Sequence, residues 1–169
     1  REGVRIGRTI LGSKVTEKAD VVIVSSHPAD QDFWQSPKAM YGAEPALKGD
    51  RGGTIIMISP NHEGIGPHPE YPEYMSRDDG DDIVRACIAG EEIPGDRLAI
   101  AVGNSMSKMR RRRKLVVVGG GVTAEQMAQC GCKYYPLSAL QQAVDDAVAE
   151  YEDCRVAAMS GGADAFLYE

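Results

Sequence analysis

A seven-residue segment combines side chains that could together bind a small anionic substrate. Residues 32–38 read Asp-Phe-Trp-Gln-Ser-Pro-Lys, and they follow an apolar run over residues 19–24 that is typical of a buried parallel strand. In open α/β sheets, ligands bind beyond the carboxyl ends of the strands. We therefore expect Trp34, Gln35 and Lys38 to contribute to a ligand site.

The chemistry of these three residues suits a small carboxylate or a keto acid. The ammonium group of Lys38 is a compact positive charge that can stabilise negative charge developing on an oxygen. The amide of Gln35 can donate to one oxygen and accept from a hydroxyl group, and Trp34 offers a flat apolar wall. Because Trp34 and Lys38 are four positions apart, a helix would place them on one face. The alternative is that Trp34 packs in the core and Lys38 is solvated.

Apolar strand patterns alternate with helical patterns through the rest of the sequence. The expected strands cover residues 21–25, 53–59, 114–118, 133–137 and 155–159. The expected helices cover residues 33–47 (broken or kinked near Pro37 and Pro45), 81–89, 94–109, 123–129 and 138–151. This alternation predicts an α/β fold with a parallel, Rossmann-like open sheet of about five strands and helices on both faces.

Local signals refine this layout. Thr123 is expected to cap the helix that follows it, and Ser138 with Gln141 has the spacing of a capping box. Residues 1–18 show no strong period and are interpreted as an N-terminal lead-in segment. Residues 19–169 are interpreted as a single α/β domain.

The loop at residues 60–72 follows the second expected strand and is rich in glycine and histidine. Gly64 and Gly66 would let its backbone bend and approach a ligand, so we expect this loop to shape or close a pocket. His62, His68 and the more distant His27 could in principle meet at one sheet edge and bind a metal. Their spacing matches no known ligand pattern, and no metal site is predicted.

A glycine-rich turn supports the main alternative function. Residues 119–124 fit the loose pattern G-x-G-x-x-A between a strand and a helix, which would make the chain a non-catalytic nucleotide- or small-ligand-binding module. The acidic residue expected about 20 positions later is absent, and the turn follows the third strand instead of the first. A plain tight turn before a capped helix is therefore favoured.

The composition is that of an ordinary soluble domain. The chain has 169 residues, 43% of them hydrophobic and 26% charged, and a net charge of -6, which argues against nucleic acid as a partner. No run approaches the roughly 18 apolar residues of a membrane span, and no signal peptide is recognised. The four cysteines lack the paired spacing of a zinc site. We expect a cytoplasmic protein with structural cysteines.

Several segments in combination resemble a known family. Residues 19–26, 32–39, 52–56 and 62–64 are similar to the C-terminal domain of the nickel-pincer lactate racemase family, an isomerase family, and the resemblance is firm over about residues 19–74. It implies that Gln35 and Lys38 are catalytic residues in a cleft between two domains. Lys38 would bind or polarise the oxygen of a 2-hydroxy acid, and Gln35 would orient it.

The resemblance also bears on the substrate. Trp34 stands where the lactate enzyme has a tyrosine, so it is expected to bind substrate, and that substrate need not be lactate. The family includes racemases and epimerases of other 2-hydroxy acids.

The resemblance further implies a cofactor and a second domain. In the family, hydride moves from substrate C2 to a nickel pincer nucleotide and back, while a histidine base takes the hydroxyl proton. That base, the lysine that tethers the cofactor and the nickel ligand belong to an N-terminal domain. Because the sequence begins at Arg1, we interpret it as the C-terminal part of a longer protein, with the missing domain as its partner. We expect this segment alone to hold no cofactor or metal and to be inactive.

Overall fold

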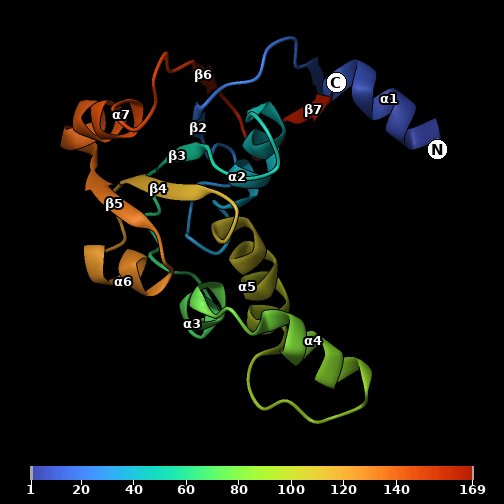
Figure 1. Ribbon diagram of the computed structural model, residues 1–169. Helices are drawn as coiled ribbons and strands as arrows, with labels where there is room; N and C mark the ends of the chain where they lie inside the picture. Colours follow the sequence, from blue (N-terminus) through green and yellow to red (C-terminus); the bar gives the residue numbers. More distant parts are fainter. Residues whose placement is uncertain (1, 169) are drawn as a thin grey trace.

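A five-stranded parallel sheet forms the centre of the computed structural model, which describes residues 2–168 (Figure 1). Its strands are β2 (Val21–Ser25), β3 (Thr54–Ser59), β4 (Lys114–Gly119), β5 (Lys133–Pro136) and β6 (Val156–Met159). They lie in the order β5-β4-β3-β2-β6, and every neighbouring pair is parallel. The α/β fold and the five-stranded sheet expected from the sequence are confirmed.

Helices cover both faces of this sheet, because both faces of its central strands are apolar. The helices are α2 (Lys38–Ala43), α3 (Tyr71–Ser76), α5 (Arg97–Arg110), α6 (Ala124–Gln129) and α7 (Leu140–Val148). On one face, Val22, Ile55 and Met57 belong to a core cluster with residues of α2, α3, α5 and α6. On the other face, Ile56 belongs to a cluster with residues of α7. Alternate residues of each strand therefore fill two separate cores.

An arm projects away from the sheet, on the side where α3 lies (Figure 1). It consists of α4 (Gly80–Ile88), the loop that follows, and the N-terminal part of α5 (Figure 1). Asn104 of α5 donates to the carbonyl oxygen of Gly80 at 3.2 Å. Asp96 caps α5 by accepting hydrogen bonds from the backbone N–H groups of Leu98 and Ala99. Among the described residues, no helix is long and apolar enough to cross a membrane.

The expected helix over residues 33–47 is wrong in its extent. Residues 33–37 form consecutive turns, α2 begins only at Lys38, and Glu44–Ala46 is a short 3₁₀ helix. Pro37 explains the late start, because proline has no N–H group and disfavours the helical conformation of the residue before it. Trp34 and Lys38 therefore do not share a helix face.

The two expected helix caps have different outcomes. Thr123 accepts from the backbone N–H of Gln126 at 3.2 Å while the Gln126 side chain accepts from the backbone N–H of Thr123 at 2.8 Å, so this cap is confirmed. The expected capping box of Ser138 and Gln141 is wrong. Leu137–Ala139 forms a 3₁₀ turn, and α7 then begins at Leu140 without a side-chain cap.

The first residues contain regular structure that the sequence analysis missed. They form α1 (Glu2–Leu11) and β1 (Gly12–Lys14), and β1 pairs in parallel with β7 (Phe166–Tyr168) at the other end of the chain. The guanidinium of Arg8 lies over the rings of Phe166 and Tyr168, 5.8 Å and 5.5 Å from their centroids. The described part of the lead-in segment is thus attached to the end of the chain by a second, two-stranded sheet.

A carboxylate at the start of β2 ties three segments together. Asp20 accepts from the ammonium group of Lys48 at 2.7 Å and from the backbone N–H of Arg155 at 2.9 Å. The hydrogen bond from Lys48, helped by that from Arg155, lowers the pKa of the Asp20 carboxyl group. These contacts stabilise the charged form of Asp20 in the folded chain.

Truncation of Ile56 tests the core beneath α7. Ile56 is fully buried, so Ile56→Ala should lower the free energy of unfolding by about 2–5 kcal/mol, measured by urea denaturation. Ile88→Ala removes the same atoms from a side chain that is 81% exposed and should change stability by less than about 0.5 kcal/mol. Equal losses in the two variants would contradict the assignment of Ile56 to a packed core.

Acid titration tests the Asp20 contacts. Because the pKa of Asp20 is lower in the folded chain than in the unfolded chain, its stabilising contribution is complete above the unfolded value of about 3.9 and is lost as the pH falls through the folded value. Asp20→Asn should therefore be less stable than wild type at pH 7, and the difference should shrink under acid conditions. Asp50→Asn, at an exposed loop position, is the matched control. A pH-independent difference for Asp20→Asn would refute the ionic contribution.

Candidate functional site

The turn that carries the predicted site residues is held by Asp32. Its side chain accepts from the backbone N–H of Gln35 at 2.8 Å, and its carbonyl oxygen accepts from the N–H of Ser36 at 3.0 Å. Phe33 is fully buried and anchors the turn in the core. This short turn therefore fixes the backbone from which Trp34 and Gln35 project.

Lys38 and Gln35 meet at this turn. The ammonium group of Lys38 donates to the side-chain oxygen of Gln35, and Lys38 is exposed. Since the acceptor of Gln35 is used in this way, its N–H groups are left to donate to an incoming oxygen. An ammonium group and an amide donor side by side can bind a carboxylate, or a carbonyl or alkoxide oxygen.

Trp34 joins these two groups around one depression. The depression has a volume of about 260 Å³, and its lining residues are Trp34, Gln35, Pro37, Lys38, Tyr41, Tyr71, Val102 and Met106. The structure thus brings together the three residues predicted from the sequence, although by a turn instead of a helix face. The residues contributed by α3 and α5 (Tyr71, Val102 and Met106) were not predicted, because nothing in the local sequence links them to residues 32–38.

The glycine-rich loop supports the turn from outside. The carbonyl oxygen of Gly64 accepts from the backbone N–H of Phe33 at 2.8 Å. Gly66 has a positive φ of 95°, and a Cβ atom there would lie 2.9 Å from the Cβ of Trp34 and 3.0 Å from the Cγ of Asp32. Glycine is therefore required for this close approach. The loop thus supports the turn that carries Trp34, while its expected role in closing a pocket stays a prediction.

The histidines are dispersed. His27 is exposed near Asp30, and His62 is exposed on the loop. The ring of His68 packs on the Trp34 indole, with a centroid distance of 4.0 Å, and its Nδ1 is hydrogen-bonded to Asp96. Within residues 2–168, no group of three or more His, Cys, Asp or Glu side chains is arranged to hold a metal ion.

The glycine-rich turn that suggested a nucleotide site is packed against the chain itself. A Cβ atom at Gly119 would lie 1.7 Å from the carbonyl oxygen of Ser59, and one at Gly121 would lie 1.7 Å from the carbonyl oxygen of Asn61. Gly121 also has a positive φ of 69°. These contacts explain both glycines by backbone packing, without a bound nucleotide.

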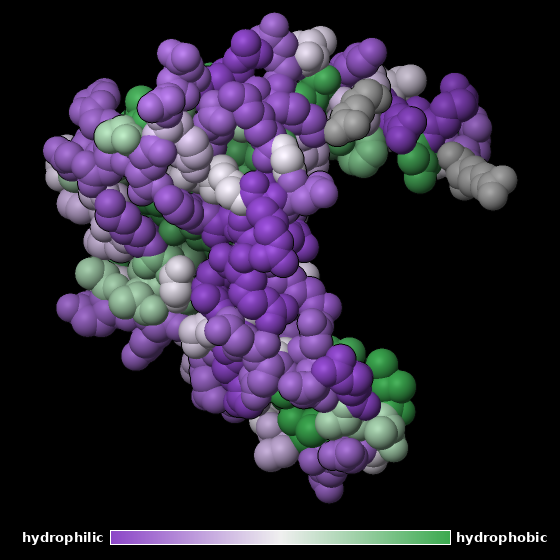
Figure 2. All heavy atoms as spheres, in the orientation of Figure 1, coloured by the Kyte–Doolittle hydropathy of each residue, from purple (hydrophilic) through white to green (hydrophobic). Residues whose placement is uncertain are grey.

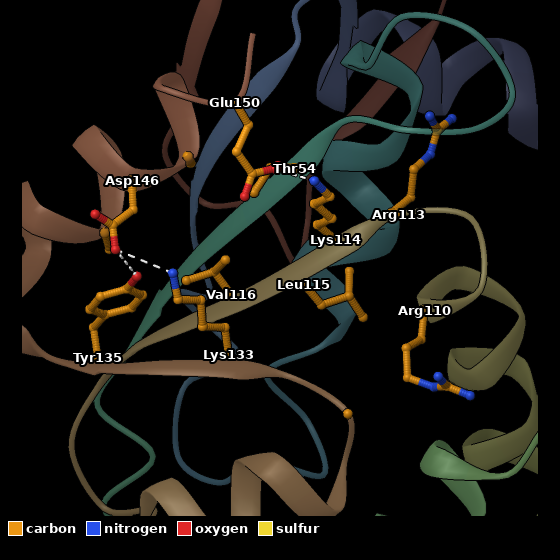
Figure 3. Close-up of a pocket in the computed structure, with 13 residues that line it drawn as sticks. Thr54, Arg110, Arg113, Lys114, Leu115, Val116, Lys133, Tyr135, Asp146 and Glu150 are labelled. Carbon is orange, nitrogen blue, oxygen red and sulfur yellow. Dashed lines mark hydrogen bonds and ion pairs between the residues drawn. The ribbon is translucent and has the colours of Figure 1, made fainter.

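A second depression, of about 320 Å³, lies at the opposite end of the strands, where β3, β4 and β5 begin (Figure 3). Figure 3 shows that its two lysines are matched by acids: Lys133 contacts Asp146 at 3.2 Å, and Lys114 contacts Glu150. Arg113 is bound to Glu44 and to backbone carbonyl oxygens. Because these charges are already paired, this depression is a weaker candidate for an anion site.

A third hollow lies on the arm. Figure 2 shows an apolar patch there, and the groove of about 670 Å³ is lined by residues of α4, of α5 and of the loop between them, including the aliphatic side chains of Ile88 and Ile100. It lies away from the carboxyl ends of the strands. It does not combine an amine, an amide and an aromatic ring as the depression at Lys38 does.

The cysteines do not favour a thiol mechanism. The four cysteines are free, and burial raises the pKa of the thiols of Cys130 and Cys132, the latter to about 12. A thiol with so high a pKa is a poor nucleophile at neutral pH. These two buried thiols are therefore poorly suited to nucleophilic chemistry, and the structural role expected from the sequence stays a prediction.

Comparisons with known proteins agree with this description. Residues 15–164 match the family model of the lactate racemase C-terminal domain. The fold resembles the structure of the lactate racemase apoprotein from Thermoanaerobacterium thermosaccharolyticum, with a TM-score of 0.78 and 22% sequence identity. That match covers 99% of this chain and 40% of the racemase chain. No curated protein sequence shows a significant match. Since the family model matches most of the length of this chain, the chain belongs to the lactate racemase C-terminal domain family.

Proposed function

We propose that this chain supplies the substrate-binding face of a 2-hydroxy acid racemase or epimerase. The observation that carries the proposal is the meeting of Trp34, Gln35 and Lys38 around one depression, in a chain of the lactate racemase C-terminal domain family. The substrate is a small 2-hydroxy acid, lactate-like in its reacting part. The protein is a cytoplasmic isomerase.

Each of the three residues has a distinct role in the proposal. Lys38 binds the substrate oxygen that gains negative charge and stabilises it. Gln35 fixes the amine of Lys38 through its side-chain oxygen and orients the substrate through its N–H groups. Trp34 forms the apolar wall against which the substituent at C2 lies, together with Val102 and Met106. An apolar wall favours an apolar substituent over a charged one.

The proposal includes a second domain. The chain spans 40% of the length of the racemase structure that it resembles. The exposed position of Lys38 supports a site that is completed from outside, by an N-terminal domain that precedes residues 19–169 in a longer protein. This domain and the hydroxy acid are the proposed partners.

The cofactor of the complete protein is proposed to be a nickel pincer nucleotide bound by that second domain. The side chains described here do not fit a metal site, since His27 and His62 are exposed and dispersed and His68 is bound to Asp96. No step is therefore assigned to the cofactor through residues of this chain. Its own residues bind, orient and surround the substrate.

Removal of the Lys38 amine tests the proposal. In the two-domain protein with its cofactor, Lys38→Ala should lower kcat for racemisation about 10²–10³-fold, because a charge-stabilising contact is lost in the transition state. The rate is measured as isotope exchange at C2 of the hydroxy acid. Lys14→Ala, which removes an exposed amine from β1, is the matched control and should leave the rate unchanged. An unaffected rate in Lys38→Ala would remove Lys38 from the mechanism.

A further inference from the structure

The indole of Trp34 is held between two other rings. His68 packs on it with a centroid distance of 4.0 Å and an angle of 41° between the ring planes. Tyr71 meets it edge to face, with a centroid distance of 5.1 Å. Tyr71 also lines the depression, whereas His68 does not. His68 therefore packs behind the Trp34 wall of the depression without lining the depression itself.

His68 is itself fixed by the start of α5. Its Nδ1 is hydrogen-bonded to Oδ2 of Asp96, and its side chain is only 17% exposed. The other carboxylate oxygen of Asp96 accepts from the backbone N–H groups of Leu98 and Ala99 at 2.9 Å and 3.3 Å. The backbone N–H of Asp96 in turn donates to Glu70 at 3.0 Å. A chain of contacts thus runs from the first turn of α5 through His68 to the indole.

We propose that His68 is a positioning residue, held by Asp96, that fixes the orientation of the Trp34 indole as a wall of the substrate depression. The part that concerns substrate rests on the function proposed above. Two side-chain torsions set the direction of an indole, and contacts on two sides restrict both of them. A histidine serves better than a purely apolar ring, because the hydrogen bond at Nδ1 fixes the orientation of the packed ring as well as its place.

The charges around this contact agree with a bound, oriented imidazole. Asp96 faces His68 from the N-terminus of α5, and Glu70 lies behind Asp96 on the loop. The hydrogen bond with His68 is the largest cause of the lowered pKa of the Asp96 carboxyl group. Asp32 lies near Gly66 and accepts from the turn, and the amine of Lys38 is held by Gln35. Asp96 is therefore the group that sets the orientation of His68.

Fluorescence reports this contact directly, because Trp34 is the only tryptophan of the chain. In the 169-residue chain, His68→Ala should lower the anisotropy of the tryptophan emission and increase its quenching by acrylamide, since the indole gains freedom and exposure. His68→Phe keeps an aromatic ring against the indole and should restore most of the anisotropy. His62→Ala, an exposed histidine of the same loop, should leave both signals unchanged. Signals in His68→Ala that equal those in His62→Ala would overturn the inference.

Kinetics of the two-domain protein separate positioning from mere stability. His68→Ala should raise KM for the hydroxy acid roughly tenfold and change kcat by less than about threefold, because the wall contacts substrate and transition state alike. Asp96→Asn, which retains a good helix cap, should shift KM in the same direction by a smaller factor. A lowered anisotropy with an unchanged KM would also overturn the inference. If the wild-type protein turns over no hydroxy acid, the proposed function fails, and the anisotropy comparison still decides whether His68 positions Trp34.

Discussion

The parallel pairing of β2 with β3 is the constraint on which the site depends. Ser25 is in register with Ile58, so the two strands end at the same edge of the sheet. The segments that follow must then pack against each other, and their backbones do so directly: Asn61 and Glu63 donate to Asp30 and Gln31 at 3.1 Å and 2.9 Å. The turn with the site residues is thus positioned by a loop that follows a different strand.

Glycine makes this packing possible. The backbone of the loop approaches Asp32 and Trp34 so closely at Gly66 that no side chain fits between them. Asp32 is 6% exposed, and its carboxylate is used within the turn, where it accepts from the N–H of Gln35. A buried carboxylate requires such partners, and here it finds one in the backbone that it shapes. The loop and the turn therefore define each other, and changes in either should move Trp34.

The five strands of the central sheet and the grouping of Trp34, Gln35 and Lys38 could be predicted from the sequence, because both follow from local patterns. Runs of Val and Ile mark β2, β3 and β4, and the carboxyl end of β2 places Trp34, Gln35 and Lys38 near one edge. The start of α2 was missed because Pro37 overrides the helical spacing that precedes it.

Contacts between distant segments could not be predicted in this way. The contact of His68 with Asp96 joins residues that are 28 positions apart, and β1 pairs with a strand at the far end of the chain. No periodicity in a single sequence encodes such pairs. The family resemblance rested on several segments in combination, over about residues 19–74, yet the ring that packs against Trp34 became visible only in the folded structure.

The two ends of the strands differ in how their cations are neutralised, and this difference favours the depression at Lys38 as the candidate anion site. At the amino edge, Lys114 and Lys133 contact carboxylates, so an incoming anion would have to compete with a fixed negative charge. At the carboxyl edge, Lys38 contacts the neutral amide of Gln35 instead. Its orientation is fixed while its charge stays uncompensated among the described residues. A second surface that excluded water here would strengthen the attraction between this ammonium group and a substrate oxygen, because the same charge acts more strongly in a medium of lower dielectric constant.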